Sequence, residues 1–207
     1  MRFMRRRLFA IATCATVLAA GCASRPRPVR PPLRPLTRPS LRSQTGPASR
    51  PAVHVSGMQV QTLPEQTYFH VRKNTTFQDV ERAMDEALAD LSRAAEAGRV
   101  TFTGPPTFVY LGLTDELSRP FTLDVGYPVD EGTRPFGRFR VRTLDPLKAA
   151  AVTYTGPVSM IDKGYDRLIP AMEASGLQPA GETREVYLEW HGPDSEQNQA
   201  LIGIGIK

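Results

Sequence analysis

A short segment near the C-terminus places a carboxylate beside an aromatic ring. Alternation with a period of two indicates a β-strand, so Glu185, Tyr187 and Glu189 share one face of it. Val186, Leu188 and Trp190 then share the other face, where we expect the valine and leucine to pack under a helix. A carboxylate next to aromatic faces suits a flat, lipophilic cation, because the rings attract the charge and the carboxylate balances it. Solvent exposure of the same residues at a sheet edge is the alternative.

The elements that would position this pair occur twice along the chain. Shifting the sequence by 77 residues aligns residues 109–111 with 186–188, and residues 125–126 with 202–203. The pattern predicts two copies of a strand–helix–strand–strand unit related by a pseudo-twofold axis, although coincidence in short β-rich segments is the alternative. Phe108 and Tyr110 of the first copy would then face Glu185 and Tyr187 across a central groove.

Hydrophobic periodicity defines the individual elements. Residues 76–97 carry an apolar stripe at helical spacing, with Thr76 and Asp79 at the start and Gly98 as the stop. A second helix is predicted over 158–175, where Pro170 should kink or split it. Strands are predicted over 55–71 (broken at Pro64), 108–113, 121–129, 138–144, 149–154, 185–190 and 200–206. The fold class is therefore α+β.

These motifs, in this order, carry a family resemblance. Residues 154–157 (Tyr-Thr-Gly-Pro), a helix, and residues 181–188 with their Glu-x-Tyr resemble the gyrase-inhibitor-like (GyrI-like) domain. That domain is also the effector-binding domain of AraC- and MerR-type transcription activators. Its fold is two β-α-β-β repeats of the SHS2 type around a groove, and the resemblance covers roughly residue 55 to the C-terminus. Pro170 departs from the family's second helix.

The resemblance also implies a function. In the family the Glu of Glu-x-Tyr lies in the groove and contacts cationic, lipophilic ligands, so Glu185 would be the anchor and Tyr187 an aromatic wall. Pattern and rough alignment add a further set of groove-lining residues, namely Phe108, Tyr110, Tyr127 and Tyr154. We therefore expect a domain that binds small amphipathic molecules, cationic or aromatic, in a groove with a central Glu.

The sequence is also compatible with three other functions. Some GyrI-like proteins hydrolyse electrophilic compounds, and a carboxylate with a pKa raised by desolvation could serve as general base, which makes Glu185 the candidate catalytic residue. A related family of this fold binds haem, but His54, His70 and His191 show no ligation motif. A scaffold for a protein partner is the third. We predict no cofactor and no metal site.

The charge and the cysteine content of the domain exclude further classes of function. Residues 1–52 hold eleven Arg and no acid, so residues 53–207 hold 26 − 11 = 15 basic and 21 acidic residues, a net charge of −6. This acidic balance argues against a nucleic-acid partner. Both cysteines, Cys14 and Cys22, lie before residue 23, so the domain has no disulfide, no thiol nucleophile and no Cys-ligated zinc.

The N-terminus carries the features of a lipoprotein signal. Four arginines precede a thirteen-residue apolar stretch over 8–20, which is shorter than the ~20 residues of a membrane span. Residues 18–22 (Leu-Ala-Ala-Gly-Cys) resemble the bacterial lipobox, which implies cleavage after residue 21 and lipidation (palmitate) of Cys22. Ala23 and Ser24 then favour the outer membrane, facing the periplasm. An ordinary secretory signal is the alternative.

A tether follows the lipidated cysteine. Residues 25–51 contain eight Pro and seven Arg with no apolar periodicity, which favours an extended, disordered chain. The arginines either contact anionic components of the cell envelope or are simply solvated. The predicted organisation is thus a signal peptide (1–21), a lipidated Cys with tether (22–52) and the ligand-binding domain (53–207). No DNA-binding segment precedes the domain, so we expect no role in transcription.

Overall fold

The computed structural model describes residues 53–114 and 116–207, so the predicted signal peptide, Cys22 and tether lie outside the described residues. The described part is an α+β domain, as predicted. Its elements in chain order are β1 (His54–Val55), β2 (Gln59–Leu63), β3 (Gln66–Thr75), α1 (Val80–Glu96), β4 (Thr107–Leu111), β5 (Phe121–Pro128), β6 (Arg140–Leu144), β7 (Leu147–Thr155), a 3₁₀ turn (Val158–Met160), α2 (Asp162–Ala174), β8 (Pro179–Glu189) and β9 (Gln199–Ile206). Among these residues, no helix is both long and apolar enough to cross a membrane.

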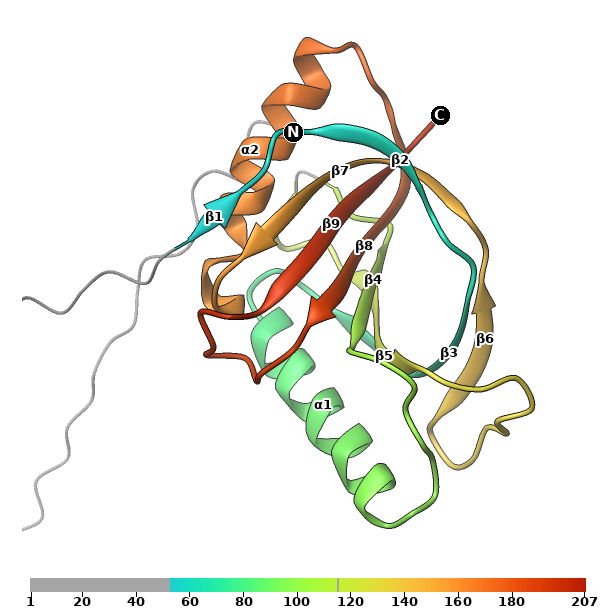
Figure 1. Cartoon of the computed structure of the whole chain (residues 1–207). Coiled ribbons are helices and arrows are strands. Elements are labelled where there is room, and N and C mark those ends of the chain that lie inside the picture. Colours follow the sequence, from blue (N-terminus) through green and yellow to red (C-terminus); the bar gives the residue numbers. More distant parts are fainter. Residues whose placement is uncertain (1–52, 115) are drawn as a thin grey trace, which may run out of the picture. The chain divides into compact units, whose positions relative to one another are not determined.

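One antiparallel sheet joins all the strands (Figure 1). Its order is β1-β7-β9-β8-β4-β5-β3-β6, and β2 also pairs with β7. β2 and β7 lie near one end of this order, whereas β3 and β6 lie near the other end. Yet only two residues connect β2 to β3, and only two connect β6 to β7, so the two ends of the sheet come close together. The sheet therefore curls, which leaves one face under the helices and a second face on the inside of the curl.

The order strand–helix–strand–strand occurs twice, as β3-α1-β4-β5 and as β7-α2-β8-β9. β4 pairs with β8 at the centre of the sheet, where Phe108 lies directly opposite Glu185. These two residues differ by 185 − 108 = 77, the offset that aligns the sequence with itself. A twofold axis through this pair would require that register, but the repeat and its symmetry axis stay predictions.

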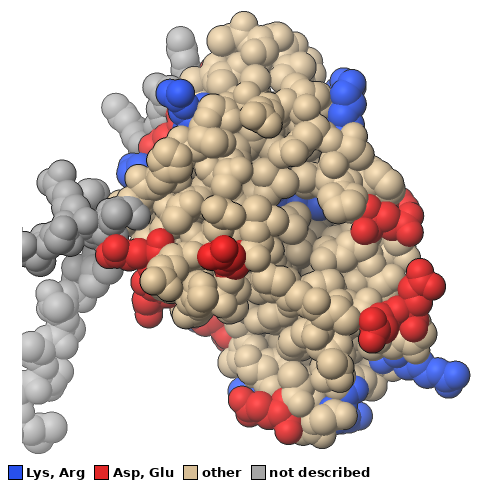
Figure 2. All heavy atoms as spheres, in the orientation of Figure 1, with Lys and Arg blue, Asp and Glu red and all other residues tan. Residues whose placement is uncertain are grey.

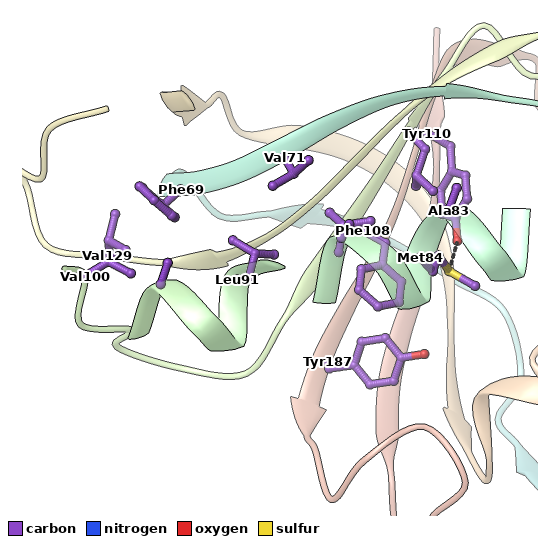
Figure 3. Packing of buried hydrophobic residues seen from close by; sticks show 14 of the residues in the cluster. Phe69, Val71, Ala83, Met84, Leu91, Val100, Phe108, Tyr110, Val129 and Tyr187 are labelled. Carbon is purple, nitrogen blue, oxygen red and sulfur yellow. Dashed lines mark hydrogen bonds between the residues drawn. The ribbon is translucent and has the colours of Figure 1, made fainter. Parts of the chain in front are cut away.

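Helix α1 forms where the apolar stripe predicted it. Its buried residues include Met84, Ala87 and Leu91 at helical spacing, and they pack on the sheet in one cluster with Phe108 (Figure 3). The helix stops before Gly98, whose φ of +66° suits glycine and whose N–H bonds to a carbonyl of the last turn. The glycine stop was predicted correctly.

Helix α2 packs its own stripe of Tyr165, Leu168, Ile169 and Met172 on the strands β7 and β9. The helix runs without interruption from Asp162 to Ala174, so Pro170 does not split it.

The strand-face prediction for residues 185–190 was partly wrong. Both helices cover the face that carries Glu185 and Tyr187, whereas Leu188 is exposed and Val186 half-buried on the opposite face. A register shift between Tyr187 and Glu189 marks a β-bulge, which adds one residue and reverses the alternation. Trp190 consequently returns to the side of Tyr187.

Candidate functional site

Glu185 lies at the centre of the sheet, on the face that both helices cover. The side chain is 2% exposed. Its Oε1 accepts a hydrogen bond of 2.6 Å from the Tyr165 hydroxyl of α2. Its Oε2 is buried and has no hydrogen-bond partner among the described residues. The site therefore holds a carboxylate with one satisfied and one free oxygen.

The absence of a positive partner sets Glu185 apart from the other buried carboxylates of the described residues. Asp90 is paired with Arg93 and, at 2.7 Å, with Arg138. Asp124 is paired with Arg72 and Arg142 at 2.7 and 2.9 Å. Removing an ionised carboxylate from water is unfavourable unless a cation compensates, and only Glu185 lacks one.

This environment shifts the ionisation of the carboxyl group. Burial raises the pKa of Glu185 from its usual 4.5 to about 7, although the hydrogen bond from Tyr165 and the nearby Tyr110 hydroxyl partly oppose the rise. The same burial, with the nearby Glu185 charge, raises the pKa values of Tyr165 and Tyr110 well above 10. Near neutral pH the carboxyl group therefore exists in both forms, while the phenols stay protonated.

Aromatic side chains lie next to Glu185 on this face of the sheet, and Figure 3 shows three of them, Phe108, Tyr110 and Tyr187. Phe108 and Tyr187 pack against one another with ring centroids 5.3 Å apart, and Trp190 meets Tyr187 edge-on at 4.7 Å. The hydroxyl of Tyr110 points to the Met84 sulfur at 3.8 Å. The Tyr187 hydroxyl, like Glu185 Oε2, is buried without a described partner. Two unpartnered polar atoms thus occur within one aromatic cluster.

A pocket of about 80 Å³ opens beside this cluster. Tyr165 and Ile169 of α2, Thr183 of β8 and Phe77 form part of its wall, with Leu113 and Leu117 from the chain after β4. Thr183 and Glu185 are alternate residues of β8 on the same face, so the pocket ends one step short of the carboxylate. The Tyr165 side chain belongs to both, since it lines the pocket and donates a hydrogen bond to Glu185.

Four of the six predicted site residues come together here: Glu185, Tyr187, Phe108 and Tyr110. Tyr154 contributes to the neighbouring cluster under α2, where its hydroxyl donates to the Pro157 carbonyl at 2.7 Å. Tyr127 stacks on Phe102 with ring centroids 4.1 Å apart and has no described contact with Glu185.

Tyr165, the direct partner of Glu185, was not predicted. The one available signal was a hydroxyl-bearing ring within the apolar stripe of α2.

The three histidines lie away from this pocket. His70 is buried on the other face of the sheet, stacked on Tyr68 and 3.7 Å from Asp124, whereas His54 and His191 lie at the surface. None of them lines the pocket. No group of three or more His, Cys, Asp or Glu side chains in the described residues has the arrangement of a metal site.

No protein-family model and no curated protein matches the sequence. Solved structures do match. The EcmrR C-terminal domain has a TM-score of 0.57 and 18% identity, and the match covers 72% of this chain and 96% of that one. SAV2435 bound to tetraphenylphosphonium has a TM-score of 0.56 and 13% identity, with 73% and 94% covered. EcmrR in a complex with DNA has a TM-score of 0.58 and 17% identity over 75% of this chain, which spans only 57% of that longer chain.

These likenesses establish the class of fold. The described domain has the α+β fold of the GyrI-like, effector-binding domains, as the sequence predicted.

Proposed function

We propose that this domain binds an apolar organic cation with aromatic groups on the helix-covered face, with ionised Glu185 as its counter-charge. The observation that carries the proposal is the buried carboxylate without a cation, in a domain that provides arginines for its other two. A bound organic cation would supply the missing charge, and the faces of Phe108 and Tyr187 would attract it further. The tetraphenylphosphonium on SAV2435, a protein of the same fold, supports this ligand class.

Binding requires the pocket to enlarge. Sites for drug-sized ligands measure about 300–1,000 Å³, whereas the pocket beside Glu185 measures about 80 Å³. Tyr165 lines the pocket and hydrogen-bonds Glu185, and we infer that its movement off Glu185 would join the pocket to the carboxylate. The ligand would then replace one neutral hydroxyl donor by a full positive charge. That exchange favours the ionised form of Glu185 and links cation binding to proton release.

A pair of probes with one shape and opposite charges tests the proposal. We would titrate the full chain with tetraphenylphosphonium and with tetraphenylborate, and follow the fluorescence of Trp190, the single tryptophan, which contacts Tyr187. We expect Glu185→Gln to weaken the phosphonium at least about tenfold and to leave the borate unchanged or tighter. Equal losses for both ions would show that the substitution disturbs the shape of the site and that charge is not recognised.

Hydrolysis of small electrophilic compounds is the second candidate, favoured by the pKa of about 7 for Glu185. A carboxyl group titrating near neutral pH suits a general base that activates water. Turnover would then rise with pH through that pKa and vanish in Glu185→Gln. A flat pH profile would exclude this role.

We also propose that the domain is held at a membrane. The lipobox-like Leu-Ala-Ala-Gly-Cys supports lipidation of Cys22, and residues 23–52 would form a Pro/Arg-rich tether to a domain in the periplasm, anchored in the outer membrane. The arginines would contact anionic envelope components where these lie within reach. Metabolic labelling with palmitate tests the anchor: the wild-type chain should incorporate it and Cys22→Ser should not. Equal labelling would place the lipid elsewhere.

We further propose that the domain consists of two structural repeats. Two β-α-β-β repeats, related by a pseudo-twofold axis between Phe108 and Glu185, would place the carboxylate on the axis with one helix on each side. Each repeat would contribute one wall of the binding site.

A further inference from the structure

The sheet face that points away from the helices carries its own charged groups. Register places Arg184, Val109, Asp124 and Arg72 in one row across β8, β4, β5 and β3. Residues in register project from the same face of a sheet. Asp124 is 0% exposed and accepts hydrogen bonds from Arg72 and Arg142, so its charge is compensated. Arg184 is the other charged residue of the row that is deeply buried.

The guanidinium of Arg184 is only partly used. The residue is 4% exposed, and its Nε donates to Glu182 Oε1 at 2.5 Å. No described residue accepts a hydrogen bond from its Nη1 or Nη2. The two nitrogens are also not fully buried. Each nitrogen therefore keeps a small area in contact with solvent. Figure 2 shows basic atoms recessed in a hollow, in the part of the view that Figure 1 fills with β8 and β4.

Apolar side chains lead from this arginine to the surface. Val186 and Leu188 follow it at alternate positions of β8, hence on the same face, and Leu201 of β9 pairs with Val186. Leu188 is 48% exposed, and Val186 and Leu201 are half-buried. Large aliphatic residues at the surface next to a buried charge form a surface that is apolar along its length and cationic at its inner end.

We propose that this face binds a carboxylate with an apolar chain, an anionic amphiphile of the fatty-acid type. Its carboxylate would accept two hydrogen bonds from Nη1 and Nη2 of Arg184, a planar fork that matches a carboxylate. Its chain would lie along Val186, Leu188 and Leu201.

The local charge also favours a monoanion. Three arginines and two carboxylates (Arg184, Arg72, Arg142, Glu182 and Asp124) leave a net charge of 3 − 2 = +1. This site lies on the opposite face from Glu185 and is independent of the cation site proposed above.

Calorimetric titration of the full chain with decanoate tests the site, with decanol and decyltrimethylammonium as chain-matched controls. We expect decanoate to bind, decanol to bind at least about tenfold more weakly, and Arg184→Gln to lose at least about tenfold in decanoate affinity. Glu182→Gln removes the competing carboxylate, so it should tighten decanoate severalfold. A gain in affinity cannot arise from misfolding.

Two matched variants test the apolar part. Leu188→Ser should weaken the binding of decanoate about three- to tenfold. Val60→Ser is the control and should leave the affinity unchanged. Val60 is similarly exposed (50%), but its register neighbour Ala150 belongs to the helix-covered face. Glu185→Gln should leave decanoate binding unchanged. The proposal is overturned if decanoate does not bind, if decanol binds equally, if Glu182→Gln weakens binding, or if Glu185→Gln abolishes it.

Discussion

Replacing Glu185 with Gln is expected to stabilise the fold above neutral pH, although it removes the proposed anchor. In the folded state the pKa of Glu185 is about 7, against 4.5 for the ordinary group. The folded state thus holds the proton more tightly than the unfolded chain does. Stability from this group is fully present below pH 4.5 and is lost as the pH rises to about 7. Gln keeps the acceptor for Tyr165 but never ionises.

The size of the effect follows from the shift. A difference of 2.5 pKa units corresponds to about 3 kcal/mol of unfolding free energy, since one unit is worth about 1.4 kcal/mol. Glu185→Gln should therefore match the wild-type chain near pH 4.5 and exceed it by about 3 kcal/mol at pH 8 and above. Between these values the difference should grow by about 1.4 kcal/mol per pH unit.

Urea denaturation of the full chain at pH 4.5, 6, 7 and 8.5, followed by circular dichroism, measures this difference. Glu189→Gln is the matched control, because Glu189 ends the same strand with its side chain 62% exposed. The control should track the wild-type chain at every pH. If Glu185→Gln is no more stable than wild type at pH 8.5, Glu185 is not an uncompensated buried charge, and the main argument for a cation site is lost.

Three further substitutions test particular contacts. Tyr165→Phe removes the hydroxyl donor to Glu185, so it should raise the pKa of that carboxyl group and move the rise in cation affinity to higher pH. Because the cation no longer has to displace the hydroxyl, its affinity at pH 9 should be at least that of the wild-type chain, as fluorescence titration at pH 7 and 9 measures. Gly164→Ala would place a methyl group 2.2 Å from the Ile202 Cδ1 atom and should lower the unfolding free energy, measured in urea, by about 1–3 kcal/mol. The double variant with Ile202→Val should lose less. If the single and double variants lose the same stability, the contact with Ile202 does not cause the loss. Asp124→Asn leaves two partly exposed arginines without their counter-charge and should lower the unfolding free energy by about 1–3 kcal/mol, whereas an unchanged or higher stability would contradict the ion-pair account.

Local periodicity accounts for the elements that could be predicted. The period-two pattern identified the strand with Glu185 and Tyr187, and the helical stripe with Gly98 located α1. The pattern could not reveal the β-bulge at Leu188, because an inserted residue changes backbone register without a change of composition. The orientation of Trp190 was therefore wrong. The helices also cover the face of Glu185 and Tyr187, and not the face of Val186 and Leu188 as predicted.

The contacts that make up the site depend on packing between distant elements. Tyr165 reaches Glu185 across a helix–sheet interface and 20 positions in the chain, which no local pattern encodes. Likewise, Arg72, Arg142 and Asp124 come from three strands. The sheet register pairs Arg72 with Asp124, whereas Arg142 lies opposite Tyr68 and reaches Asp124 only through its long side chain. The aromatic residues next to Glu185 on the central strands could be predicted by alternation. Tyr127 could not be excluded, because it shares their face and differs only in its neighbours.

The pH dependence of cation affinity tests the central claim most directly. Tetraphenylphosphonium should bind the wild-type chain more tightly as the pH rises from 5 to 8, by up to about tenfold per pH unit below the pKa of about 7, and with little change above it. Glu185→Gln should bind weakly at every pH. If the wild-type affinity is the same at pH 5 and pH 8, or if Glu185→Gln keeps the wild-type pH dependence, Glu185 does not supply the counter-charge.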